Sequence, residues 1–226
     1  MDFLNSIILL TNFIIVPGIT YGSQLALGAS GVTLIYGVLR FANFAYGDLM
    51  AFGTMVVILM TWYLQSKGIS FGLLPTALLA LPIGILLTIA VSLFFDKTVF
   101  EYYRNKKSNP VTFIVVSLGI MFVLNAVVRI IIGPNDINFM DGHKFIMKAR
   151  EFKQLTSLNE GLAIKSTQVI TLITTIITCS ILFYFLNKTK TGKSMRAYSN
   201  NEDLALLSGI DPKKLVLITG VKVCML

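Results

Sequence analysis

The charged residues of this chain are so unevenly placed that long stretches contain none. Lys, Arg, Asp, Glu and His are all absent from residues 3–39 and from four further stretches. These stretches are Leu49–Ser66, Gly68–Phe95, Ser108–Val128 and Ser166–Asn187. A helix needs about 18 or more uncharged, mostly apolar residues to cross a hydrocarbon layer of ~30 Å. The pattern therefore predicts several membrane-spanning helices.

Composition supports the same class of protein. Only 13% of the residues are charged and 55% are hydrophobic, whereas a soluble domain has roughly 25% charged residues. We therefore predict an all-α polytopic transmembrane helical bundle, with residues 1–226 forming a single domain and about six to seven membrane segments. The net charge of +8 would suggest nucleic acid in a soluble protein, but here the basic residues lie in loops between spans. No nucleic-acid partner is predicted.

The first uncharged stretch is too long for one simple crossing, since at 1.5 Å per residue it would extend about 55 Å. Pro17-Gly18 divides it, because proline removes a backbone donor and favours a kink or a break. Two arrangements are open: a short segment followed by one full span, or two short spans in a hairpin. The side of the membrane on which the N-terminus lies is open for the same reason.

Small residues recur every four positions in this first stretch. They are Gly18, Gly22, Ala26 and Ser30, and on a helix they would form one narrow stripe. Small residues at this spacing let helix backbones approach closely in a membrane. We expect tight packing within the chain here rather than a dedicated dimer interface.

The placement of Lys and Arg orients the spans. Residues 96–107 and 187–214 are rich in basic side chains, whereas residues 133–165 carry nearly balanced charge. Two spans separate the basic loops, so both lie on one side, and the positive-inside bias makes that side the cytoplasm. The 133–165 loop is then external. The polar turn at residues 40–48 lies at the cytoplasmic side or enters the membrane from it.

Two groups of polar residues are candidates for a pathway through the membrane. The first follows Arg40 in a short turn and comprises Asn43, Tyr46, Gly47 and Asp48. Irregular backbone at membrane depth is tolerated where it is buried in protein or lines a water-filled cavity. An interfacial turn in which Asp48 caps the next helix is equally compatible. The second candidate is Asn125, one helical turn before Arg129, and we expect Arg129 to reach water at the outer interface.

A short, well-capped helix is predicted in the second basic loop, between Arg196 and Pro212. Asn200 or Asn201 can cap its start, and Glu202 and Asp203 occupy the first turn, where the helix dipole favours negative charge. Gly209 fits the position just past its end. Such a helix either packs on the chain's own spans or docks into a groove of a cytoplasmic partner.

The residues give little support for an enzyme. The stretch Gly192-Lys193-Ser194 resembles the end of a phosphate-binding loop, but Asn187 stands where its first glycine should be, and no strand precedes it. The single histidine, His143, has no evident catalytic partner. No residues have metal-ligand spacing. We predict no catalytic residues, no metal site, no cofactor and no nucleotide site on this chain.

The same motifs resemble those of branched-chain amino-acid ABC transporter permeases of the high-affinity type. Residues 31–48 are similar to the N-terminal motif of that family, although Tyr46 stands where the family usually has histidine. Residues 117–125 are similar to its central span. Residues 191–197, followed by Ala205, Gly209 and Ile210, resemble its cytoplasmic coupling loop.

This resemblance implies a permease subunit of an ATP-driven importer in a bacterial inner membrane, carrying branched-chain amino acids or related small polar solutes such as urea and amides. It implies four kinds of partner: two ABC ATPase subunits, a homologous second permease, a periplasmic substrate-binding protein and membrane lipid. The residues expected to couple to the ATPases are Arg196, Ala197, Glu202, Asp203, Ala205, Gly209 and Ile210. Those expected along the pathway are Asn43, Tyr46, Gly47, Asp48 and Asn125.

Two alternatives to an ATP-driven permease are a secondary carrier or channel, and, less favoured by the residues, a membrane-embedded enzyme. The family continues through further spans after the coupling loop. We therefore expect the sequence to be truncated at its C-terminal end, soon after a new span begins at Leu215.

Overall fold

The helices account for most of the chain. A computed structural model describes residues 2–69, 75–106, 108–133, 139, 145–147, 163–210 and 215–220. The elements of the first half are α1 (Asp2–Leu10), the π-helix η1 (Thr11–Ile15), α2 (Val16–Leu39), α3 (Ala45–Ser66), α4 (Ala77–Phe95), the π-helix η2 (Asp96–Phe100), α5 (Glu101–Asn105) and α6 (Pro110–Ile132). Those of the second half are β1 (Phe145–Met147), β2 (Ile164–Lys165), α8 (Ser166–Lys188), α9 (Lys190–Asn200) and α10 (Glu202–Leu207).

Five helical segments in this part of the chain are long and apolar enough to cross a membrane. They are Asn5–Leu39, Ala45–Ser66, Ala77–Asn105, Pro110–Ile132 and Ser166–Lys188. The predicted all-α polytopic class is therefore confirmed. The further span expected from Leu215 is helical at residues 215–220, and its continuation lies outside the described residues.

The N-terminal run forms one continuous helical rod, in which the short segment of α1 and η1 leads directly into the 24-residue α2. The hairpin is wrong, because the backbone stays helical on both sides of Pro17. The missing N–H of Pro17 is accommodated by a widened turn just before it, in which the Val16 N–H bonds to the Thr11 carbonyl. A π-turn of this kind absorbs a local interruption without ending the helix.

The expected packing role of the small-residue stripe on the rod is also wrong among the described residues. A Cβ added to Gly18 or Gly22 would meet no atom within 4 Å, and Ala26 is exposed. The buried residues of α2 lie instead near its C-terminal end, at Gly31, Ile35 and Val38. Only this end of the rod is held inside the bundle.

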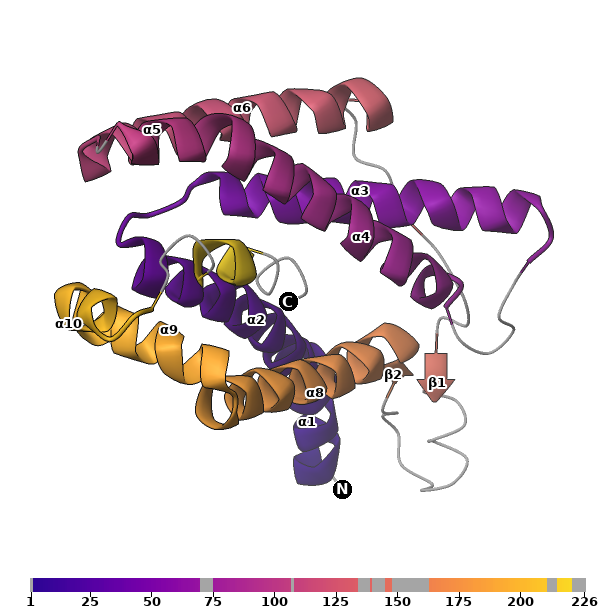
Figure 1. Cartoon of the computed structure of the whole chain (residues 1–226). Helices are drawn as coiled ribbons and strands as arrows, with labels where there is room; N and C mark the ends of the chain where they lie inside the picture. Colours follow the sequence, from indigo (N-terminus) through magenta and orange to yellow (C-terminus); the bar gives the residue numbers. More distant parts are fainter. Residues whose placement is uncertain are drawn as a thin grey trace.

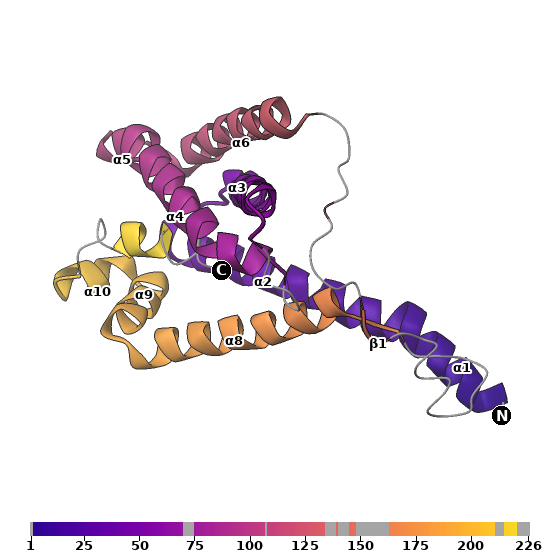
Figure 2. The same cartoon turned by 90° about the vertical axis from the view of Figure 1, so that its right-hand side faces the viewer.

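The helices form two groups that meet along α2 (Figure 1). One group contains α3 packed against α4 and α6, and the other contains α8 and α9 packed against α2, with α10 against α9. Figure 2 shows α2 running between the groups, with α1 projecting away from both. The groups are connected by the turn between α2 and α3 and by the helical residues 215–220. Leu215 packs with Val38 and Met195, and a Cβ added to Gly220 would lie 3.8 Å from the Ser92 Oγ of α4.

The two basic loops lie at the same end of the molecule, as the charge pattern predicts. Arg104 of α5 and Glu202 of α10 line one shared cavity. We call this the basic end. The antiparallel pair β1–β2 lies at the opposite end, where the Ala163 N–H donates to the Asn12 side chain at 3.0 Å. The N-terminal end of the rod is therefore on the side opposite the basic loops.

The bundle exposes far more surface than a compact soluble protein. Its accessible surface is 14349 Å², whereas a soluble protein of this mass exposes about 10,200 Å². No more than 22% of the most apolar part of any span is buried inside the chain. Lipid or other protein must therefore cover most of the apolar surface of the helices.

The contact between α3 and α4 depends on small residues, which gives a stability prediction. A Cβ on Gly84 would collide with a methyl group of Val57, whereas a Cβ on Gly119 of α6 would meet open space. Gly84→Val should lower the free energy of unfolding by about 1–3 kcal/mol through overpacking. Unfolding in detergent, followed by circular dichroism, measures the change. Gly119→Val is the matched control, and equal losses in both variants would contradict the packing.

Candidate functional site

The turn between α2 and α3 is irregular and anchored from several sides. Arg40 ends α2 in the left-handed conformation, with φ 56°. The Asn43 side chain accepts a hydrogen bond from the Ala45 N–H at 3.1 Å. The Phe44 N–H donates to the Ser117 hydroxyl of α6 at 3.2 Å. Because backbone polar groups are satisfied here by side chains, the irregular turn can sit within the bundle.

Asp48 does not cap α3 as the interfacial interpretation required. It lies inside the helix, and its carboxylate accepts a hydrogen bond from the Asn125 side chain of α6 at 3.0 Å. The two sequence-predicted residues therefore meet across the α3–α6 contact although 77 positions separate them. Arg129, one turn further along α6, is exposed, which agrees with the prediction that its side chain reaches outward.

Tyr46 and Gly47 have opposite surroundings. Tyr46 is buried, and its ring lies directly against Gly31 of α2, where any Cβ would collide with it. Gly31 thus makes room for the residue that replaces the family's histidine. Gly47 is exposed, and a Cβ there would have no neighbour within 4 Å.

Two cavities lie beside this turn. The smaller, of about 70 Å³, is lined by Asn43 and Tyr46 among others, and the larger, of about 1060 Å³, opens at the basic end. Gly47, Asp48 and Asn125 line neither of them. Of the predicted pathway residues, the structure brings Asn43 and Tyr46 to a cavity and pairs Asp48 with Asn125.

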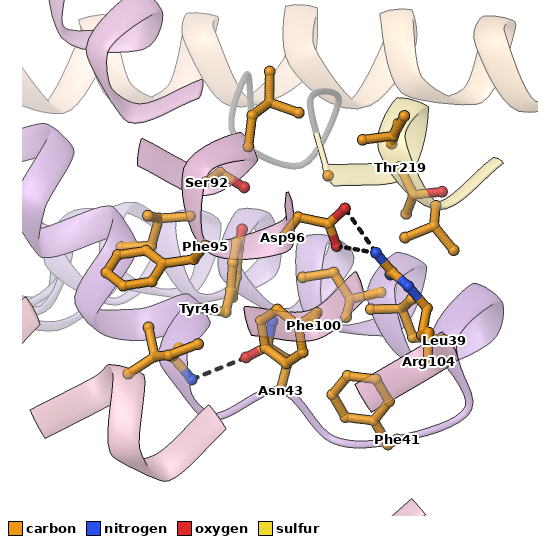
Figure 3. Close-up of a pocket in the computed structure, with 18 of the residues that line it drawn as sticks. Leu39, Phe41, Asn43, Tyr46, Ser92, Phe95, Asp96, Phe100, Arg104 and Thr219 are labelled. Atoms are coloured by element: carbon orange, nitrogen blue, oxygen red, sulfur yellow. Dashed lines mark hydrogen bonds and ion pairs between the residues drawn. The ribbon is translucent and has the colours of Figure 1, made fainter. Parts of the chain in front are cut away.

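An ion pair between Asp96 and Arg104 lies at the wall common to both cavities. Arg104 Nη2 donates to both carboxylate oxygens of Asp96 at 2.8 Å. Figure 3 shows the pair beside Phe100 and Thr219. Sequence reasoning missed these residues as a site, because residues eight positions apart on a regular α-helix lie about 12 Å apart along its axis. The π-turn η2 lies between them.

The coupling region contains two helices where the sequence predicted one. α9 was missed, although Thr189 caps it by accepting a hydrogen bond from the Gly192 N–H at 3.1 Å. Gly192, Met195 and Tyr198 are its buried residues, a helical spacing that could have revealed it. A Cβ on Gly192 would collide with the Phe185 carbonyl and lie 2.6 Å from Leu186 Cα. Close packing at the α8–α9 corner therefore accounts for this glycine.

The predicted capped helix is present as α10. Asn201, one of the two residues considered, is the cap, and its side chain accepts from the Leu204 N–H at 3.2 Å. Gly209 follows the helix with φ +79°. The Gly209 N–H bonds to the Leu206 carbonyl and the Ile210 N–H to the Ala205 carbonyl, the paired bonds of a Schellman motif. Pro212, the bound of the predicted segment, lies outside the described part of the chain.

α10 has an inward and an outward face. Ala205 is 4% exposed and packs with Val38, Met195 and Tyr198, so it faces the chain's own spans. Leu204 and Leu207 are 61% and 85% exposed. Sequence reasoning selected Ala205 and did not identify these two leucines. Arg196, Ala197 and Asp203 are also exposed.

Two side-chain bonds tie this region together and to the α2–α3 turn. Tyr198 Oη donates to Glu202 at 2.6 Å, joining α9 to α10. Burial, followed by this hydrogen bond and the charge of Glu202, raises the pKa of Tyr198 above its usual range, so the hydroxyl keeps its proton at neutral pH. Arg40 donates to the Ser199 carbonyl at 3.1 Å. The coupling region and the irregular turn are therefore in direct contact.

The fold and this site define a polytopic membrane protein with an irregular turn beside a cavity and a two-helix element at its basic end. The family described as branched-chain amino acid transport system / permease component matches residues 14–226. The chain belongs to this family.

Curated relatives agree with the family. The permease protein LivH of the high-affinity branched-chain amino acid transport system from Escherichia coli K12 is 25% identical over 208 residues, covering 90% of this chain and 64% of LivH. BraD, the corresponding permease protein of Pseudomonas aeruginosa, is 24% identical over 216 residues, covering 92% of this chain and 65% of BraD. The chain thus spans less than two thirds of the length of these relatives. No solved structure matches it.

The Asp48–Asn125 bond predicts energetic coupling between α3 and α6. In a double-mutant cycle, Asp48→Ala and Asn125→Ala should show an interaction energy of about 1–2 kcal/mol, because either single change leaves a polar partner unsatisfied. Unfolding free energies in detergent measure it. The control cycle pairs Asp48→Ala with Arg129→Ala, which should be additive. Additivity in both cycles would contradict the bond.

Proposed function

We propose that the chain is a permease subunit of an ATP-driven importer of branched-chain amino acids or related small polar solutes. It would act in the inner membrane of a bacterium. Family membership supports a permease, and the branched-chain amino acid transport systems to which LivH and BraD belong suggest the substrate class. In this proposal two ATPase subunits, a second, homologous permease and a periplasmic binding protein complete the transporter.

The two faces of α10 are the observation that supports a transporter driven by ATPase subunits. Its inner face is joined to the chain's own spans through Ala205, and its outer face presents Leu204 and Leu207 at the basic end. A short exposed apolar helix suits docking into a groove of a cytoplasmic protein. In this proposal the ATPase subunit provides the groove. The remaining coupling residues surround or shape the contact; they are Arg196, Ala197, Glu202, Asp203, Gly209 and Ile210.

Movement of the docked helix would reach the solute pathway through α9. Glu202 is held to Tyr198, and the adjoining Ser199 carbonyl is held by Arg40. Arg40 begins the irregular turn that carries Asn43 and Tyr46 to the smaller cavity. A push on α10 would therefore shift this turn, and with it the walls between which a solute passes.

The outer face of α10 gives a test of the ATPase partner. Leu207→Asp should reduce co-purification of the ATPase subunits about tenfold or more, because it places a charge in an apolar contact. The melting temperature of the permease should not change, since Leu207 packs on little of the chain. Asn200→Asp, at an exposed position of α9, is the control. Full ATPase retention by the Leu207 variant would contradict docking through this face.

Arg40 tests transmission separately from docking. Arg40→Gln should keep ATPase binding but lower solute uptake per ATP hydrolysed about tenfold, corresponding to a coupling free energy of roughly 1–3 kcal/mol. Uptake and ATP hydrolysis in proteoliposomes give this ratio, with Lys190→Gln as the control. An unchanged ratio would show that Arg40 does not transmit the movement of α10.

Uptake driven by an ion gradient without ATPase subunits would favour a secondary carrier instead.

A further inference from the structure

The Asp96–Arg104 pair has features of a binding site as well as of a structural contact. The two side chains are 20% and 28% exposed, so a solute in the larger cavity can reach them. Only Nη2 of Arg104 contacts Asp96. In the part of the chain that the structure describes, the Nε and Nη1 groups of Arg104 donate no hydrogen bond. A guanidinium with a free edge can bind a carboxylate.

The surroundings of the pair change sharply from one cavity to the other. The larger cavity contains further charged side chains, among them Lys97 and Glu101. The smaller cavity is mainly apolar, and buried Phe41, Phe100, Ile120 and Leu124 are among the residues that line it. Figure 3 shows Asp96 and Arg104 above Phe100 and Phe41 in this pocket. A solute held here would meet one negative, one positive and one apolar surface.

We propose that Asp96 and Arg104 bind the ammonium and carboxylate groups of a zwitterionic amino acid whose aliphatic side chain enters the smaller cavity. Opposite charges 2.8 Å apart match the adjoining ammonium and carboxylate of an α-amino acid, which binds alongside the pair without separating it. This inference rests on the proposed function, because it assumes that the transported solute passes through the cavity. The solute would then bind at Asp96 and Arg104, near the basic end.

The α4–η2–α5 segment gives the pair its shape. η2 replaces a regular turn between Asp96 and Glu101, and π-turns of this kind are frequent at functional sites. Phe100, at the end of η2, packs against Phe41 with ring centroids 5.9 Å apart. The same π-turn thus carries Asp96, which lines both cavities, and Phe100, which lines the smaller one.

Ligand analogues test the two charges one at a time. Binding of radiolabelled L-leucine to the purified full chain in nanodiscs is measured with two competitors: 4-methylpentanoate, which is leucine without the ammonium, and isopentylamine, which is leucine without the carboxylate. Each analogue should bind about tenfold more weakly than leucine. Asp96→Asn should weaken leucine binding about tenfold and leave the affinity for 4-methylpentanoate within about twofold. Arg104→Gln should weaken leucine similarly and spare isopentylamine.

Two further variants separate binding from folding. Exchanging the charges, with Asp96→Arg and Arg104→Asp together, should restore the ion pair and the melting temperature but not leucine binding. Ser92→Leu, at the wall of the smaller cavity, should weaken leucine and spare glycine. Any one of three results would overturn the proposal. The first is that leucine does not bind at concentrations up to about 10 mM. The others are an equal loss of binding of all three ligands in the single variants, and leucine binding that returns in the exchanged variant.

These outcomes are distinct from failure of the proposed function. ATP-dependent leucine uptake by the assembled transporter, together with an equal loss of all ligands in the variants, would refute the binding position alone. The predicted ligand pattern in a chain that associates with no ATPase subunit would support the position and refute the ATP-driven importer.

Discussion

The turn between α2 and α3 is the constraint on which the rest of this structure depends. Arg40 leaves α2 in a left-handed conformation, which is costly for a residue with a side chain, so its surroundings must hold it there. They do so from both helical groups: Ser117 of α6 binds the turn on one side, and Ser199 of α9 binds Arg40 on the other. A change in the relative position of the two groups therefore acts on this turn.

The cavities follow from the same arrangement. Because the two groups diverge on either side of α2, a large space opens at the basic end, and the helical residues 215–220 occupy part of it. The smaller cavity lies between Asn43 and Tyr46 on one side and residues of the π-turn η2 on the other. We propose that a solute passes between the two helical groups, beside the turn that connects them, rather than through one of the groups.

The sequence predicted what depends on composition and local chemistry. The charge-free runs predicted the spans, and Asn201 and Gly209 marked the two ends of α10. It failed where distant contacts decide. Pro17 favoured a kink or a break, but the helix continues through the π-turn η1. The sequence also left open whether α10 packs on its own chain, and Ala205 does so against Val38 and Met195. The Asp96–Arg104 pair required a π-turn, for which the sequence offers no reliable pattern.

The central claim is that α10 and the α2–α3 turn move together through Arg40. Spin labels at Ser208 and Asn105, on a background with Cys179 and Cys224 replaced by serine, report the distance across the basic end. In the assembled transporter, trapping the ATPases with ATP and vanadate should shift this distance by several ångströms, and the shift should be largely lost in Arg40→Gln. A shift of the same size in that variant would contradict the account.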